Sequence, residues 1–324
     1  MNFAPTRVRS ADHLLHSCGG LRTGERIVVI CDGETRGLGE LFLERARLVT
    51  SEARLVESPI AQAHGQEPSA EAAAAMLDAD LIVGVTSRSM AHTRARLEAA
   101  KAGARYMSLP DYSETLMCDP CLMVDYRAAY ADVRFVADAF DRGASLRVTS
   151  AAGTDIVADI RGRKANACPG FVAAPGELGS PPDIEANISP LETKTQGVAV
   201  IDGSIAFPGF GLIDRPITLR LDGGSIVDII GDRTIAGALW GLFGRYGDKS
   251  RILAECGVGL NREAKLTGSM LTDEGAYGTV HFGFGSNATV GGINDVPFHI
   301  DLVLRQPTIA VDGREIMRSG ELTR

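Results

Sequence analysis

The sequence predicts an α/β protein with two domains: an N-terminal domain built on a parallel sheet, then a β-rich α+β domain. Three observations lead to this prediction. Over residues 1–145, short apolar runs alternate with helical segments. From residue 146 onwards, β-branched runs are separated by Asp-Gly pairs, which are typical of hairpins. Glycine is also frequent, with 37 of 324 residues, so the positions of the glycines are informative.

The strands of the first domain are predicted where short apolar runs are bounded by turn residues. These runs are residues 26–31, 53–56, 80–85 and 105–109. Segments with helical spacing of apolar or alanine residues lie between them, at 37–47, 70–78 and 90–102. The turn after the first strand carries Asp32 and Glu34 in place of a glycine-rich phosphate loop, so we expect no nucleotide site there.

The second domain, residues 146–324, is predicted to consist mainly of hairpins. Its predicted strands are residues 146–150, 197–207, 217–221, 225–230, 308–311 and 315–317. Three Asp-Gly pairs punctuate them, at Asp202, Asp222 and Asp312. One helix is expected at residues 233–246.

Charge and cysteine content exclude several classes of protein. The formal net charge is −8, which argues against binding to nucleic acid or to an anionic membrane surface. No apolar stretch approaches the roughly 18 residues of a membrane helix, and no secretory signal is visible at the N-terminus. Six cysteines in a chain of this length do not form a disulfide framework. We therefore expect a cytoplasmic location.

Metal-ligand residues are concentrated near the C-terminus. His299 and Asp301 are two positions apart in a strand-like segment, so both side chains face the same side. His281 lies in a similar segment, separated from His299 by a glycine-rich loop. Two histidines and a carboxylate suit Zn, Mn, Co or non-haem Fe. The alternative is two half-exposed strand histidines, one of them hydrogen-bonded to the aspartate.

Two glutamates extend this candidate site. Glu255 lies in an apolar, glycine-rich strand context, where a carboxylate is costly unless it is paired or bound to a metal. Glu185 lies between prolines, where the simpler interpretation is an exposed loop acid. Two glutamates, two histidines and one aspartate are sufficient for a two-metal hydrolytic site.

The chain resembles the aminopeptidase T family of metallopeptidases in four segments that occur in the same order. They are residues 182–192, 253–261, 273–285 and 291–303, with weaker similarity at 90–105 and 154–155. The resemblance implies that two metal ions are held by Glu185, Glu255, His281, His299 and Asp301. It also implies a homodimer. Both branches of the family have a histidine in the segment of His92, which implies that His92 contacts substrate; the alternative is a helix-start or surface residue.

The resemblance also has two departures. The peptidases are longer, and they use a tyrosine where this chain has Ser286 or Asn287, so we assign Asn287 to substrate binding. A related branch, the 2,5-dihydroxypyridine 5,6-dioxygenases, is of similar length and closely similar over residues 290–305, where its His-x-Asp binds iron. That branch has histidine in place of Glu255 and an apolar residue in place of His281.

These features predict a metal-dependent hydrolase of an amide-type C–N bond, in a short peptide or a small nitrogen-containing ring compound. One or two Zn, Mn or Co ions per chain would activate a water molecule, with Glu255 or Glu185 as general base. The alternative is a mononuclear non-haem Fe(II) dioxygenase that cleaves a dihydroxylated heteroaromatic ring. A third, non-enzymatic interpretation is a protein whose metal site is vestigial or structural.

Overall fold

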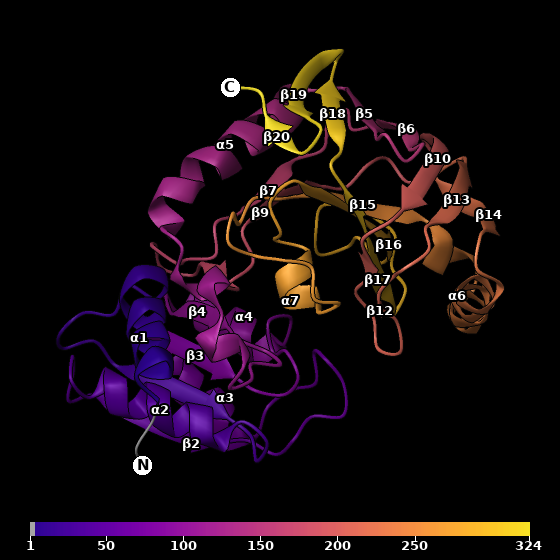
Figure 1. Ribbon diagram of the computed structural model, residues 1–324. Coiled ribbons are helices and arrows are strands. Elements are labelled where there is room, and N and C mark those ends of the chain that lie inside the picture. The colour runs from indigo at the N-terminus through magenta and orange to yellow at the C-terminus, as the bar shows by residue number, and fades with distance from the viewer. Residues whose placement is uncertain (1–3) are drawn as a thin grey trace. The chain divides into compact units, whose positions relative to one another are not determined.

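A computed structural model describes residues 4–324, and the chain forms two compact units (Figure 1). Unit 1 contains the chain up to Arg127 together with Gly170–Pro181, and unit 2 contains Ala128–Pro169 and Pro182–Arg324. The predicted division after residue 145 differs from this in two respects. The chain leaves unit 1 at Arg127, and it returns once to unit 1 before the second unit is completed.

Unit 1 is built on a parallel five-stranded sheet, as the sequence predicted. The strand order is β2-β1-β3-β4-β8, with β1 (Ile27–Cys31), β2 (Ala53–Glu57), β3 (Leu81–Val85), β4 (Arg105–Ser108) and β8 (Leu178–Gly179). Its helices are α1 (Pro5–His13), η1 (Leu14–Cys18), α2 (Arg36–Ala46), α3 (Ala70–Leu77), α4 (Arg94–Lys101), η2 (Leu116–Cys118) and η3 (Pro120–Met123). All residues of β1 and β3 are buried, which explains their continuous apolar sequences.

Two helices differ from the prediction. The helix expected at residues 90–102 begins only at Arg94, because the Thr93 side chain accepts a hydrogen bond from Arg96 N and caps the helix there. The long helix α5 (Tyr126–Arg142) was not predicted. It begins in unit 1 and continues into unit 2.

Unit 2 contains two antiparallel sheets. The eight-stranded sheet has the order β14-β13-β10-β6-β5-β18-β19-β20, and the seven-stranded sheet has the order β12-β11-β17-β16-β15-β9-β7. The strands of the first are β5 (Ser145–Thr149), β6 (Asp155–Asp159), β10 (Thr195–Ile201), β13 (Ile217–Asp222), β14 (Ser225–Ile230), β18 (Thr308–Val311), β19 (Arg314–Arg318) and β20 (Glu321–Leu322). Those of the second are β7 (Ala165–Cys168), β9 (Glu185–Ile188), β11 (Ser204–Ile205), β12 (Gly211–Leu212), β15 (Leu253–Gly259), β16 (Thr279–Gly285) and β17 (His299–Arg305). The helices of this unit are α6 (Arg233–Tyr246), η4 (Asp248–Arg251) and α7 (Met270–Asp273).

Two of the three Asp-Gly turns form hairpins as predicted, at β13–β14 and β18–β19. The third, at Asp202 and Gly203, is different because it carries the chain from the eight-stranded sheet to the seven-stranded one. Gly203 approaches the β17 backbone so closely that an added Cβ would lie 2.7 Å from the Val303 carbonyl oxygen. This crossing places β11 beside β17.

β15 and β16 form the buried centre of the seven-stranded sheet, and all seven residues of each strand are buried. Within residues 4–324, no helix is both long and apolar enough to cross a membrane. Together, these findings give an α/β fold with a parallel sheet followed by antiparallel sheets.

Candidate metal centre

The candidate ligands lie on four strands that are adjacent in the seven-stranded sheet. β9 carries Glu185, β15 carries Glu255, β16 carries His281, and β17 carries His299 and Asp301. The alternation of side chains along β17 puts its two ligands on the same face, as the sequence predicted. Antiparallel pairing of β9, β15, β16 and β17 then brings all five side chains to that face.

Glycines on this face leave room for the ligand side chains. Gly283 pairs with Glu255 across the β15–β16 ladder, and an added Cβ at Gly283 would lie 2.6 Å from His299 Nε2. At Gly257, an added Cβ would lie only 2.0 Å from His281 Nε2. Any larger residue at either position would displace a ligand. The glycine-rich sequence of these strands is thus a requirement of the site.

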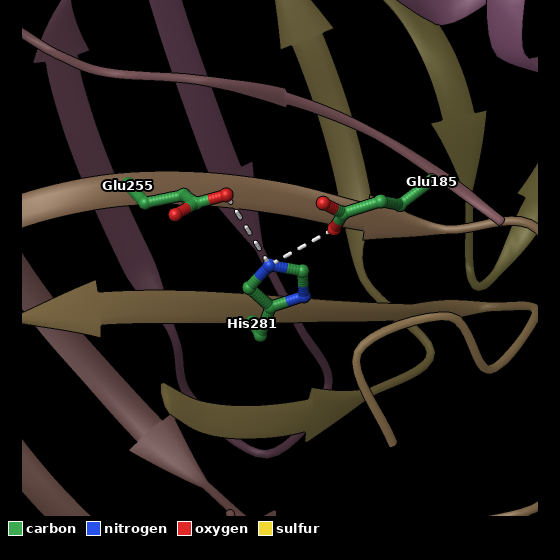
Figure 2. Close-up of side chains that lie close together, drawn as sticks. All are labelled: Glu185, Glu255 and His281. Carbon is green, nitrogen blue, oxygen red and sulfur yellow. Dashed lines mark ion pairs between the residues drawn. The ribbon is translucent and has the colours of Figure 1, made fainter. Parts of the chain in front are cut away.

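Three of the ligands form a deeply buried cluster, which we name the inner group: Glu185, Glu255 and His281. Figure 2 shows both carboxylates directed toward the same ring nitrogen of His281. His281 Nε2 lies 3.1 Å from Glu185 Oε2 and 3.8 Å from Glu255 Oε1. The exposed fractions of the three side chains are 7%, 9% and 2%, respectively.

The second cluster, the outer group, consists of Glu255, His299 and Asp301. His299 Nε2 lies 3.2 Å from Asp301 Oδ1 and 3.6 Å from Glu255 Oε2. His299 Nδ1 lies 2.9 Å from the Ser286 carbonyl oxygen, so Nδ1 carries a proton and Nε2 is left to face the cluster. The His299 side chain is 32% exposed, so this group is open to solvent on one side.

Glu255 belongs to both groups, with Oε1 directed to the inner group and Oε2 to the outer group. Burial raises the pKa of Glu255. Burial alone would lower the pKa of His299, but the charges of Asp301 and Glu255 outweigh it and raise the pKa to about 9. For His281, the carboxylate of Glu185 likewise overcomes burial and holds the pKa well above its ordinary value. Bound protons thus provide the positive charge that these carboxylates require.

The residues also fit a divalent cation. Three carboxylates and two imidazoles are the ligand types that Zn, Mn, Co and non-haem Fe accept. Among the described residues, the buried Glu185 Oε2 and His281 Nδ1 have no hydrogen-bond partner. A buried carboxylate oxygen left unbonded beside a histidine is expected for a metal ligand. A bound ion would replace the protons and release them.

Comparison with known proteins identifies the family. A family model described as 2,5-dihydroxypyridine 5,6-dioxygenase matches residues 12–324. The chain belongs to this family. A curated 2,5-dihydroxypyridine 5,6-dioxygenase from Pseudomonas putida is 29% identical over 189 residues, which are 55% of this chain and 54% of that protein. The matched region thus spans about half the length of the curated relative.

Solved structures show the same fold across the dioxygenase family and aminopeptidase T. The 2,5-dihydroxypyridine dioxygenase of Pseudomonas putida KT2440 superposes with a TM-score of 0.85 at 22% identity, covering 98% of this chain and 96% of that one. Wild-type AmpT from Thermus thermophilus superposes with a TM-score of 0.71 at 15% identity, covering 98% and 99%. The predicted relationship to aminopeptidase T and its dioxygenase branch is therefore confirmed. These relatives are enzymes, and this chain shares their fold and carries a candidate metal site.

The structure gives Asn287 surroundings that differ from the predicted substrate-binding role. Its side chain is fully buried in the β16–β17 loop. Nδ2 donates to Ser189 Oγ at 2.8 Å and to Glu192 Oε1 at 2.9 Å, and Oδ1 accepts from Asn294 N at 2.7 Å. These bonds occupy the amide in organising the loop. Neighbouring Ser286 contributes its carbonyl oxygen to His299 rather than a side-chain ligand.

His92 lies outside the ligand strands, in the turn that precedes α4 in unit 1, and it is exposed. Its assignment to substrate binding remains a prediction.

Two acids near the cluster were not singled out from the sequence. Asp183 precedes Glu185 by two residues, and burial raises its pKa well above the usual range. Glu274 follows α7, and burial together with the charge of Asp301 raises its pKa well above the usual range. Asp183 lies before β9 begins, so strand alternation could not place it. Glu274 is adjacent to Asp301 only through the folding of the loop that precedes β16.

Proposed function

We propose that this protein is a metal-dependent dioxygenase that opens the ring of a dihydroxylated nitrogen heteroaromatic compound at a single non-haem Fe(II) ion. The observation that carries this proposal is the family match over residues 12–324. The named relative supports it better than it supports hydrolysis. The open side of the outer group is consistent with a site that admits a planar small molecule.

In this proposal, Glu255, His299 and Asp301 would hold the iron, which supplies binding and activation of O₂ and of the ring hydroxyl groups. The Ser286 carbonyl keeps the proton on His299 Nδ1, so that Nε2 faces the ion. The inner pair of His281 and Glu185 would hold a buried proton beside Glu255. The sheet behind these residues excludes water from one side of the reacting centre.

A second candidate function, hydrolysis of an amide-type C–N bond, is favoured by the ligand set. Oxygenases of this kind commonly use two histidines and one carboxylate on one face of the iron. The outer group instead has one histidine and two carboxylates. Glu255 also contributes one oxygen to each group, an arrangement suited to two divalent ions. Two Zn, Mn or Co ions would supply an acidified water, and Glu185 or Glu255 would accept its proton.

The two functions predict different responses to oxygen and to loss of Glu185. We expect the Fe(II)-loaded protein to consume O₂ with 2,5-dihydroxypyridine, and the Glu185→Gln variant to retain one iron. Oxygen electrode traces and metal analysis measure both quantities. If O₂ is not consumed, and Zn, Mn or Co instead supports cleavage of small cyclic amides or leucyl peptides that is lost in Glu185→Gln, the dioxygenase proposal is wrong and hydrolysis replaces it.

A further inference from the structure

The two carboxylate oxygens of Glu185 have different surroundings. Oε1 accepts a hydrogen bond of 2.6 Å from Asn187 Nδ2. Oε2 is buried without a hydrogen bond and lies 3.1 Å from His281 Nε2. Because Glu185 and Asn187 are two positions apart on β9, their side chains lie on the same face, and Asn187 can reach the oxygen turned away from His281.

A second asparagine fixes the direction of this hydrogen bond. Asn166 of β7 pairs with Asn187 across the β7–β9 ladder, and its Nδ2 donates to Asn187 Oδ1 at 2.7 Å. The same Nδ2 donates to the Val290 carbonyl oxygen at 3.2 Å. A carbonyl oxygen only accepts, so Asn166 must present its NH₂ group to both partners. Asn187 must then present its oxygen to Asn166 and its NH₂ group to Glu185.

The second N–H of the Asn187 side-chain amide also has an acceptor. Nδ2 lies 3.9 Å from Cys168 Sγ, at the end of β7. Asn187 is only 3% exposed, so water does not compete for its amide. Val290 thus determines the orientation of the whole chain of amides, through Asn166 and Asn187 to Glu185.

We propose that Asn187 and Asn166 are positioning residues that make Glu185 a one-oxygen ligand of a divalent cation at the inner group. The inference rests on the two-metal arrangement of the second candidate function, because the dioxygenase proposal places a proton rather than an ion at the inner group. A neutral amide occupies Oε1 without adding charge, and it leaves Oε2 to face the ion. Outer hydrogen-bond partners of this kind typically change metal affinity by about 10–100-fold.

The hydrogen bonds from Val290 through Asn166 and Asn187 to Glu185 also connect both groups of ligands to one loop. Val290 lies in the β16–β17 loop, whose Ser286 carbonyl orients His299 in the outer group. Displacement of this loop would therefore affect Glu185 and His299 together.

The test is Mn²⁺ binding to the full-length protein, measured by titration calorimetry and by metal content after equilibrium dialysis. The variants are Asn187→Leu, which removes the donor to Glu185, and Asn166→Leu, which removes the donor that orients Asn187 without adding a charge. Glu185→Gln shows the effect of altering the ligand itself. Thr154→Val is the control, because Thr154 is equally buried and exchanges hydrogen bonds with Val200 in the eight-stranded sheet.

We expect Asn187→Leu and Asn166→Leu to lower the affinity for the same Mn²⁺ ion that Glu185→Gln affects, by about 10–100-fold. Thr154→Val is expected to bind Mn²⁺ as the unaltered protein does. Asn166 makes its hydrogen bonds to Asn187 and Val290, so an effect of the uncharged Asn166→Leu change on the ion is transmitted through Asn187. Unchanged Mn²⁺ affinity in both asparagine variants overturns the inference, as does Mn²⁺ binding that is insensitive to Glu185→Gln. If the variants change Mn²⁺ affinity as expected but the Mn²⁺-loaded protein cleaves neither cyclic amides nor leucyl peptides, the inference stands and hydrolysis is wrong.

Discussion

At the scale of single residues, Glu255 is the one side chain shared by both groups of ligands. Its two oxygens lie 3.8 Å and 3.6 Å from the ring nitrogens of His281 and His299. Glu255 is buried beside four other ionisable ligands. Its carboxylate can therefore remain an anion only when a protonated histidine or a metal cation lies close to it. The sequence already indicated this from the apolar residues on both sides of Glu255.

Gly283 tests whether space beside the ligands is required. We expect Gly283→Ala to weaken metal binding at the outer group and to lower the free energy of unfolding by about 1–3 kcal/mol, because the added methyl overlaps His299. The control is Gly244→Ala in α6, where nothing lies within 4 Å. That change is expected to stabilise the protein by about 0.5–1 kcal/mol. Urea unfolding and metal titration measure both effects. Full metal affinity in Gly283→Ala would contradict this account of the glycine.

The raised pKa of His299 predicts pH-dependent metal binding. With a pKa of about 9, the ring is protonated at pH 7, and it must lose that proton to bind an ion through Nε2. Metal affinity is therefore expected to rise by up to about tenfold per pH unit between pH 7 and 9. Above pH 9 the ring is already deprotonated, so His299 should cause no further rise. Mn²⁺ titrations in buffers of different ionisation enthalpy would count the released protons. Affinity independent of pH over this range would show that His299 does not exchange a proton for the ion.

At the scale of elements, the β16–β17 loop is held by Asn287 and its partners Ser189, Glu192 and Asn294. We expect Asn287→Ala to cost about 2–3 kcal/mol, because the buried polar groups of these partners lose their hydrogen bonds. Hydrogen exchange should become faster over residues 286–298. If stability and exchange are unchanged while KM rises, Asn287 binds substrate instead, as the sequence analysis had proposed.

Local patterns predicted the elements of the site better than their connections. Alternation in β17 correctly placed His299 and Asp301 on one face, and Arg233–Tyr246 is the predicted helix. The pairing of Glu255 with Gly283 could not be predicted, because register depends on contacts between strands that are distant in sequence. For the same reason, the pattern gave no sign that the chain changes sheets at Asp202.

At the scale of the whole molecule, the boundaries of the two units could not be predicted from changes in composition along the chain. Residues Gly170–Pro181 return to unit 1 and add the two-residue strand β8 beside β4. A strand of two residues has no periodicity that a sequence could display. The predicted homodimer and cytoplasmic location remain predictions, which light scattering and cell fractionation would test.

The central claim is that the cluster around Glu255 is the metal centre of this protein. The most direct measurement is an anomalous difference map from crystals equilibrated with Fe²⁺ or Mn²⁺. We expect a peak bounded by Glu255, His299 and Asp301. A second peak beside Glu185 and His281 would indicate the two-metal arrangement. Absence of any peak at these residues, at metal concentrations that saturate binding in solution, would contradict the claim.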